Sequence, residues 1–223
     1  MQETTEAQKI KVLLVEDHPL FRDQLTQLIN RDLGMVVCGE ADNIEQALTI
    51  IEKQRPDIAI VDITLRGSSG LELVKNLKVR DINIPVLVLS MHDESIYGER
   101  ALRAGARGYI TKYAASSEVM QAIRKVLDGE IYLSKGMTAQ VLQRLADKGS
   151  PAGAPVTELL TDRELEVFQL VGHGRNTHEI AQHLHLGEPT IDTYRARIKE
   201  KLRLKNSAEL YHRATKWVTE QGT

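Results

Sequence analysis

Five short runs of consecutive apolar residues alternate with segments of helical periodicity over the first 130 residues of the chain. The runs are Ile10–Val15, Met35–Cys38, Ile58–Val61, Val86–Leu89 and Arg107–Ile110. Unbroken apolar runs of this kind are typical of strands that are buried on both faces of a sheet. Between the runs, leucine, isoleucine and alanine recur about every three or four positions, which indicates helices that bury one face. The alternation predicts an α/β fold, a doubly wound five-stranded parallel sheet with right-handed crossovers.

The chain of 223 residues is long enough for two domains, and its composition changes after residue 130. A helical pattern near residues 138–146 predicts a short helix. Residues 148–155 contain proline and glycine and few large apolar residues, which indicates a flexible linker. Beyond it, four helical patterns with capping signals, such as Thr161 followed by Glu164, predict a small all-α domain. We therefore expect a tail at 1–9, a sheet domain at 10–130, a linker with a short helix at 131–156 and a helical domain at 157–223.

Polar groups stand after four of the five apolar runs. Glu16 and Asp17 follow the first run, and Asp62 follows the third run, which is expected to be the central strand. Ser90 follows the fourth run, and Lys112 comes shortly after the fifth. Because parallel strands end at the same edge of a sheet, these groups are expected to meet in one crevice, where open α/β folds bind their ligands.

This set of side chains is suited to holding a hard cation and a phosphoryl group together. Two or three carboxylates and a backbone carbonyl supply the oxygen ligands that Mg2+ prefers. Asp62, beside such an ion, can act as a nucleophile and form an acyl phosphate. Lys112 would then pair with one phosphoryl oxygen, and Ser90 would donate a hydrogen bond to another.

Four motifs of the sheet domain resemble the receiver domain of bacterial two-component response regulators, over residues 10 to about 128. They are Leu13-Leu-Val-Glu-Asp-His-Pro19, Val61-Asp-Ile-Thr-Leu65 with Gly70, Val88-Leu-Ser90 and Gly108-Tyr-Ile-Thr-Lys112. The resemblance implies a flavodoxin-like fold in which Asp62 is the phosphoacceptor. It also implies that Ser90 and Lys112 contact the phosphoryl group and that Tyr109 turns inward on activation. The Mg2+ ligands that it implies are Glu16, Asp17, Asp62 and the backbone carbonyl of Thr64.

One departure and one rival interpretation bear on this site. Tyr113 follows Lys112 where receivers often carry proline, so the conformation of that loop is left open.

The rival interpretation is a phosphatase with an aspartate nucleophile, of the haloacid dehalogenase type, which needs a second acid two residues after the nucleophile. That position is Thr64, which disfavours turnover and favours a phosphorylated state that can persist.

The helical domain carries a basic helix over residues 190–204. Arginines and lysines flank its apolar stripe and can clamp phosphates as a helix enters a major groove. The stripe, which predicts one buried face, consists of Ile191, Tyr194, Ile198 and Leu202. From about Thr157 to Trp217 the domain resembles LuxR-type helix-turn-helix domains, on the motifs Leu160-Thr-Asp-Arg-Glu-Leu-Glu-Val167, Gly174, Glu179-Ile-Ala181, Thr190 and Lys201-Leu202. Together with the receiver, this indicates the NarL/FixJ class of response regulator.

We expect DNA contacts from the sides of this helix that face away from its apolar stripe. Asp192, Thr193 and Ala196 are predicted to lie nearest the base edges, and Asp192 stands where family members often carry lysine. The last helix, about residues 207–218, is expected to form the contact between two copies of the chain. The resulting two-fold dimer would match two inverted half-sites in the DNA. The predicted DNA-contacting set is Thr190, Asp192, Thr193, Arg195, Ala196, Arg197, Lys199 and Lys201.

Composition bears on whether the chain binds nucleic acid or membranes and on its expected location. The net charge of −2 and the pI of about 6.4 give no overall attraction to nucleic acid or membrane, so DNA binding has to come from a local patch. No apolar run approaches the roughly 18 residues of a membrane span. The polar first residues lack the order of a signal peptide, so the cytoplasm is the expected location. The single cysteine, Cys38, excludes an internal disulfide.

The sequence as a whole predicts a phosphorylation-controlled transcription regulator. It is not expected to be an enzyme beyond self-phosphorylation from small phosphodonors and self-dephosphorylation. The expected partners are a sensor histidine kinase, double-stranded DNA and a second copy of the chain when phosphorylated, with RNA polymerase as a further candidate. Two alternatives stay open: the phosphatase, and a receiver-type adaptor that binds proteins and no DNA.

Overall fold

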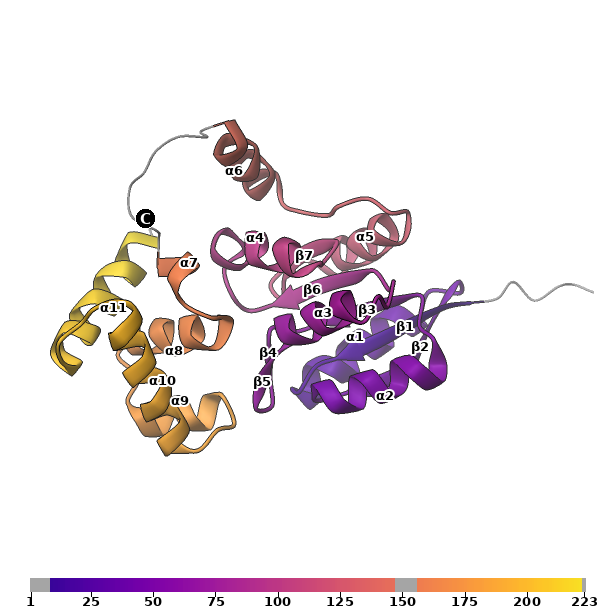
Figure 1. The fold of residues 1–223 in the computed structure, drawn as a ribbon. Helices are drawn as coiled ribbons and strands as arrows, with labels where there is room; N and C mark the ends of the chain where they lie inside the picture. Colours follow the sequence, from indigo (N-terminus) through magenta and orange to yellow (C-terminus); the bar gives the residue numbers. More distant parts are fainter. Residues whose placement is uncertain (1–8, 147–155, 222–223) are drawn as a thin grey trace, which may run out of the picture. The chain divides into compact units, whose positions relative to one another are not determined.

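The computed structural model describes residues 9–146 and 156–221 of the chain, and it contains the expected parallel sheet. All neighbouring strand pairs in this sheet are parallel, and β3 is central. The predicted α/β doubly wound fold is confirmed. The strands run in the order β2-β1-β3-β6-β7 (Figure 1) and are β1 (Ile10–Val15), β2 (Met35–Ala41), β3 (Ile58–Val61), β6 (Val86–Ser90) and β7 (Gly108–Thr111).

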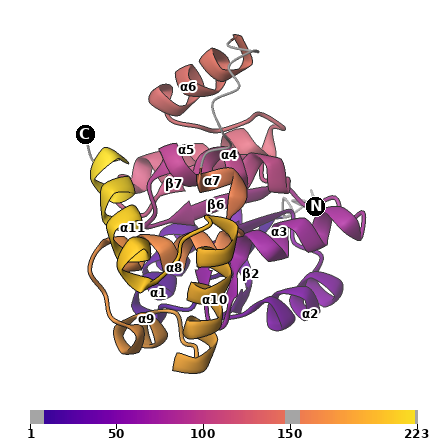
Figure 2. The ribbon, with the colours of Figure 1, turned by 60° about the vertical axis from the view of Figure 1, so that its left-hand side comes forward.

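Helices cover both faces of the sheet (Figures 1 and 2). One face is covered by α1 (Pro19–Asn30) and α5 (Ser116–Leu127). Leu25, Ile29 and Ile123 of these helices join strand residues in one apolar core. Because side chains on either side of a strand are buried, the strands are unbroken apolar runs. The other face is covered by α2 (Ile44–Gln54), α3 (Gly70–Val79) and α4 (Glu94–Ala104).

A short hairpin lies between β3 and α3, formed by β4 (Thr64–Leu65) and β5 (Ser68–Ser69). Gly67 makes its turn at a φ of 75°, a left-handed conformation that glycine adopts at little cost. The Ser69 hydroxyl then accepts a hydrogen bond from the Leu71 N–H and caps α3. The hairpin is not among the predicted elements, because strands of two residues carry no periodic signal.

The segment after α5 returns to the sheet. Tyr132 forms a parallel bridge beside Gly108 of β7, and α6 (Lys135–Ala146) follows it. This helix begins before its predicted start near residue 138, because the hydroxyl of Ser134 accepts a hydrogen bond from the Met137 N–H and caps it. Residues 148–155 of the predicted linker and residues 1–8 of the predicted tail lie outside the described residues.

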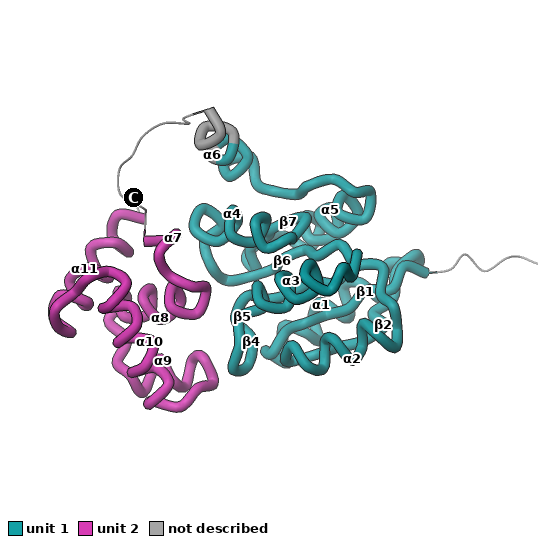
Figure 3. The backbone as a smooth tube through the Cα atoms, in the orientation of Figure 1, with its two compact units in different colours: residues 1–148 teal, residues 149–223 magenta. Residues whose placement is uncertain are grey.

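The helical unit, residues 149–223 in Figure 3, is separate from the unit of residues 1–148. The rings of Phe168 and Trp217 are buried in its core, with centroids 5.7 Å apart. Four helices correspond to the predicted ones, and α7 is an additional single turn that begins inside the predicted linker. No described helix of either unit is long and apolar enough to cross a membrane. The helices are α7 (Val156–Leu159), α8 (Asp162–Gly172), α9 (Thr177–His183), α10 (Glu188–Lys201) and α11 (Ser207–Gln221).

The buried Arg163 links α8 to the end of α9. Arg163 pairs with Glu166 one turn later in α8, and both side chains are almost fully buried. Arg163 Nη2 also donates to the Leu184 carbonyl oxygen at the end of α9, at 3.3 Å. A buried charge is costly unless it is paired and hydrogen-bonded. Because the Leu184 carbonyl is one of the partners of Arg163, the end of α9 is held next to α8.

We predict that Gly172→Ala destabilises the helical unit. A Cβ at Gly172 would lie 2.6 Å from the Ala214 carbonyl oxygen and 2.5 Å from Val218 Cγ2 in α11. Gly→Ala inside a helix ordinarily stabilises by about 0.5–1 kcal/mol, but overpacking here should cost roughly 1–3 kcal/mol. Denaturant unfolding followed by Trp217 fluorescence measures the change. Thr215→Ala, at an exposed position of α11, is the control, and equal stability of the two variants would contradict the packing argument.

Candidate functional site

The strand ends bring three carboxylates together at the point where the strand order reverses. β1 and β3 are parallel neighbours, so Glu16 and Asp17 stand beside Asp62. The three residues are buried, with exposures of 2%, 6% and 3%. Possible ligand atoms of these residues and His18 all lie within 4.8 Å of one another. The acids expected at one edge of the sheet are therefore one cluster, in the crevice that open α/β sheets use for ligands.

Lys112 lies across this cluster and holds two of the carboxylates. Its Nζ is 2.6 Å from Glu16 Oε2 and 2.8 Å from Asp62 Oδ2. It also lies 4.6 Å from the centre of the Phe21 ring, a cation–π contact. Burial lowers the pKa of Lys112, but the charges of Asp62 and Glu16 outweigh it, so the pKa is raised overall and the side chain stays protonated.

The electrostatics of Asp62 fit a divalent cation. Burial raises the pKa of Asp62 to about 6; Lys112 opposes this rise, and Glu16 adds to it. Among the described residues, none forms a hydrogen bond with the buried Asp62 Oδ1. A buried acceptor of this kind is costly, and a cation would satisfy it while favouring the ionised carboxylate. The clustered carboxylates are hard oxygen donors, so the residues present fit Mg2+.

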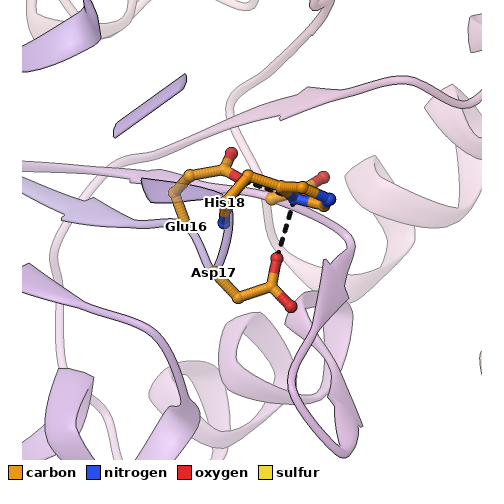
Figure 4. A group of neighbouring side chains, drawn as sticks. Glu16, Asp17 and His18 are labelled. Carbon is orange, nitrogen blue, oxygen red and sulfur yellow. Dashed lines mark hydrogen bonds and ion pairs between the residues drawn. The ribbon is translucent and has the colours of Figure 1, made fainter. Parts of the chain in front are cut away.

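His18 is a member of the cluster that sequence reasoning missed. Its Nδ1 lies 3.0 Å from Glu16 Oε1 and 3.0 Å from Asp17 Oδ1 (Figure 4). Its backbone N–H also donates to Glu16 Oε1 at 3.0 Å. The available signal is its place directly after the acid pair, in the short loop that leads into α1. His18 orients both acids from the solvent side of the crevice.

Ser90 and Tyr109, the predicted switch pair, meet around the backbone of His92. The Tyr109 hydroxyl donates to the His92 carbonyl oxygen at 2.8 Å, and the His92 N–H donates to Ser90 Oγ at 3.4 Å. The His92 Nε2 lies 3.0 Å from Thr64 Oγ1, and its ring packs on Tyr97. Tyr109 is fully buried, and burial raises its pKa. The loop after β6 therefore connects the residues next to Asp62 with the interior of β7.

The loop after β7 keeps Lys112 at the site without the proline that receivers often carry. The peptide between Lys112 and Tyr113 is trans, like every described peptide bond. The Lys112 N–H donates to the Ser90 carbonyl oxygen at 2.9 Å, and the Ala114 N–H donates to the Thr111 carbonyl oxygen at 3.0 Å. The first bond joins the ends of β6 and β7, and the second closes the turn after β7. Tyr113 itself points away, with 76% of its surface exposed.

In the helical unit, α10 carries a polar side opposite its buried stripe. Of the predicted stripe, Ile191 and Ile198 are fully buried, whereas Tyr194 and Leu202 are half-buried. Lys199, beside the stripe, is half-buried. Most residues of the predicted DNA-contacting set are exposed, namely Thr190, Asp192, Thr193, Ala196, Arg197 and Lys201.

Two bases of that set have partners inside the helical unit. Arg195 donates to Thr177 Oγ1 at 2.6 Å and to the Tyr211 hydroxyl at 2.8 Å, and it stacks on the Tyr211 ring. Lys201 Nζ lies 2.6 Å from Glu164 Oε2, in the capping pair of α8. Both side chains therefore hold α10 against its neighbouring helices, and their predicted contact with DNA stays a prediction.

Comparison with known proteins decides the family. Residues 12–124 match the family model described as the response regulator receiver domain. Residues 158–214 match the model described as bacterial regulatory proteins, luxR family. The chain belongs to the response regulators. Its two domains in this order make it a member of the NarL/FixJ class, as the sequence motifs indicated.

Relatives span nearly the whole of this response regulator. The transcriptional activator protein ExaE of Pseudomonas putida is 36% identical over 91% of this chain and 94% of its own. The response regulator GacA of Pseudomonas aeruginosa is 34% identical over 90% of this chain and 93% of its own. The crystal structure of a LuxR-family two-component response regulator from Aurantimonas sp. SI85-9A1 is 31% identical, with a TM-score of 0.58, over 62% of this chain and 99% of that one.

We predict that Gly70→Ala disrupts the site of this response regulator. A Cβ at Gly70 would lie 1.8 Å from the Asp62 carbonyl oxygen, which cannot yield without moving the end of β3. The variant should lose roughly 1–3 kcal/mol of receiver stability, as measured by denaturant unfolding. It should also lose Mg2+-dependent binding of beryllofluoride, as measured by 19F NMR. Gly136→Ala, where the nearest atom would be 3.8 Å away, is the control, and indistinguishable behaviour of the two variants would contradict the clash.

Proposed function

We propose that this response regulator accepts a phosphoryl group on Asp62 from a sensor histidine kinase and thereby controls transcription through DNA binding. The Asp62 carboxylate carries the proposal. It is buried, Lys112 holds its Oδ2 at 2.8 Å, and its Oδ1 has no hydrogen-bond partner among the described residues. A carboxylate that is held in place by a fixed cation, with its second oxygen open to a metal ion, suits a nucleophile.

The transfer forms a bond between an Asp62 carboxylate oxygen and phosphorus while the bond from phosphorus to the kinase histidine nitrogen breaks. The histidine nitrogen keeps the electron pair of that bond, and an acyl phosphate remains on Asp62. The charge on the phosphoryl oxygens is met by Lys112 Nζ and by the Ser90 hydroxyl. Mg2+ supplies further charge neutralisation when bound. The ligands that we assign to it are Glu16, Asp17, Asp62 and the backbone carbonyl of Thr64.

The acyl phosphate is a signal and not an intermediate of turnover. A phosphatase of this type would need an acid two residues after Asp62 to protonate the leaving group. Thr64 stands there instead, and its hydroxyl is 3.0 Å from His92 Nε2. The same carboxylate can take phosphate from small phosphodonors and return it to water, which is the extent of the catalysis that we propose.

Ser90 and Tyr109 carry the signal away from Asp62. If the Ser90 hydroxyl moves to donate to a phosphoryl oxygen, the hydrogen bond that Ser90 Oγ accepts from the His92 N–H at 3.4 Å is stretched. The His92 carbonyl oxygen also accepts the Tyr109 hydroxyl, so a shift of this loop changes the surroundings of Tyr109. This coupling lets a charge at the phosphoacceptor alter the surface around α4.

The output is sequence-specific binding of double-stranded DNA by α10 in a major groove. Thr190, Asp192, Thr193 and Ala196 are exposed at the start of the helix, where base edges are read. Arg197 and Lys199 would contact phosphates. Pairing of two copies through α11 would present two such helices to inverted half-sites, and RNA polymerase is the further partner that we propose for the bound dimer. The activator name of the relative ExaE supports this output.

We expect Asp62→Asn to abolish phosphorylation. Acetyl phosphate with Mg2+ should add the mass of one phosphoryl group to the native chain and none to the variant, because the amide oxygen is a poor nucleophile. Intact-mass spectrometry measures this. Asp81→Asn is the matched control: Asp81 is exposed with a φ of 57°, which asparagine tolerates. Equal modification of Asp62→Asn and the native chain would remove Asp62 from its role.

We expect Arg197→Ala to weaken DNA binding without changing the sequence preferred. The DNA is first selected from a random pool by the chain carrying beryllofluoride and Mg2+. Loss of one phosphate contact should lower the slope of log affinity against log salt by about 0.9. Arg31→Ala, an exposed charge at the end of α1, should leave the slope unchanged. If no sequence is enriched by the activated chain, the protein is an adaptor and the DNA part of the proposal is wrong.

A further inference from the structure

Residues 131–137, here called the strap, cover the outer edge of β7. The Tyr132 N–H donates to the Arg107 carbonyl oxygen at 2.9 Å, and the Tyr109 N–H donates to the Tyr132 carbonyl oxygen at 2.9 Å. Gly108 makes this approach possible, because a Cβ there would lie 3.1 Å from Tyr132 Cβ and 2.9 Å from Leu87 Cδ1. The backbone of the switch residue Tyr109 is therefore bonded directly to the strap.

The strap is also anchored to α4. The Ser134 N–H donates to Glu94 Oε1, in the first turn of α4, at 2.9 Å. Met137 is only 3% exposed and packs against Gly98, where a Cβ would lie 3.2 Å from Met137 Cε and 3.4 Å from Met137 Cγ. The end of the strap thus lies on α4, and α6 continues from it (Figure 1).

Met137 is the only buried residue of the strap. A cavity of about 570 Å3 lies between it, α4, β7 and α5. Ile131, at its start, is 58% exposed. An element with few buried apolar contacts opens at a small fraction of the global unfolding free energy. The strap is therefore poised to leave α4 when an anchor is disturbed.

The contact between the strap and Glu94 leads back to the loop after β6. Glu94 is separated from Ser90 only by Met91, His92 and Asp93, and His92 is hydrogen-bonded to Ser90 and to Tyr109. A displacement of Ser90 toward a phosphoryl group would carry the start of α4, with Glu94, away from Ser134. The Tyr132 end lies on β7, whose position is set by the sheet. The two ends of the strap therefore respond differently to the same event.

We propose that the strap is an intramolecular latch on the α4–β7 face, released when Asp62 is phosphorylated. The proposal rests on the function proposed above for Asp62. Release breaks the bond between Glu94 and Ser134 and withdraws Met137 from Gly98, while Tyr132 stays paired with β7 as the hinge. The face of α4 beneath the strap becomes available, and α6, which precedes the helical unit in the sequence, is freed.

A removable disulfide tests the latch. The variant carries Cys38→Ser, Gly98→Cys and Met137→Cys. A Gly98 Cβ would lie 3.4 Å from Met137 Cγ. Met137 Cβ is one carbon–carbon bond of about 1.5 Å from that atom, so the two Cβ atoms lie within a range that includes the roughly 3.5–4.5 Å of a disulfide. The full chain is examined oxidised and reduced, with and without beryllofluoride and Mg2+. The first measurement is hydrogen exchange of the Ser134 and Met137 amides, and the second is affinity for the selected DNA.

The expected result is a gain on activation in the reduced variant only. Its exchange rate and its DNA affinity should rise by about 5- to 150-fold, the usual range of allosteric coupling, and oxidation should suppress both. Equal gains in the oxidised and reduced forms would overturn the latch. Binding of beryllofluoride itself, followed by 19F NMR, reports on Asp62 separately. Its absence in the reduced form would mean that the proposed function of Asp62 has failed.

A second variant tests the latch without any phosphoryl analogue. Glu94→Ala removes the acceptor of the Ser134 N–H, so exchange at Ser134 should rise in the chain as purified. Glu99→Ala is the matched control, because Glu99 lies on the same helix and pairs with Arg103. Unchanged exchange in Glu94→Ala, or an equal rise in both variants, would overturn the latch whatever happens at Asp62.

Discussion

The receiver site depends on the ion pairs that the buried ammonium group of Lys112 makes with two carboxylates. Lys112 lies between Glu16 and Asp62, and without its charge three buried carboxylates would repel one another in a medium of low dielectric. One lysine does not balance three acids. The remaining negative charge suits a divalent cation and helps to raise the pKa of Asp62 to about 6, although burial is the larger cause. Charge placement therefore underlies both the stability of the crevice and its chemistry.

The helical unit divides its basic side chains between two tasks. Arg195 and Lys201 bond to residues of neighbouring helices and hold α10 in place. Arg197 lies exposed on the same helix, where a phosphate can be reached. The chain carries a net charge of −2, so nucleic acid is not attracted by the protein as a whole. A few exposed bases on a rigidly held helix have to provide the binding surface.

How far the sequence predicts the structure differs from element to element. β1 and β3 were predicted to the residue, because strands buried on both faces are unbroken apolar runs. β2 continues to Ala41, past its apolar run, because Gly39 and Glu40 pair with β1 after a bulge at Cys38. Residues 131–134 carry no periodic pattern, since their hydrogen bonds go to β7 and α4 and not to neighbours in sequence. Interactions of that kind leave no local signal.

The sequence by itself determined which chemical groups stand at one edge of the sheet. Apolar runs, helical spacers and right-handed crossovers allow one parallel arrangement, and the residues after the strands then meet there. Only the tertiary structure decided which partners these and other groups take. It joined His92 to Thr64 and Tyr109, and Tyr132 to β7. The physical reason is that hydrogen bonds and ion pairs depend on distances of a few ångströms between segments far apart in the chain, which periodicity does not encode.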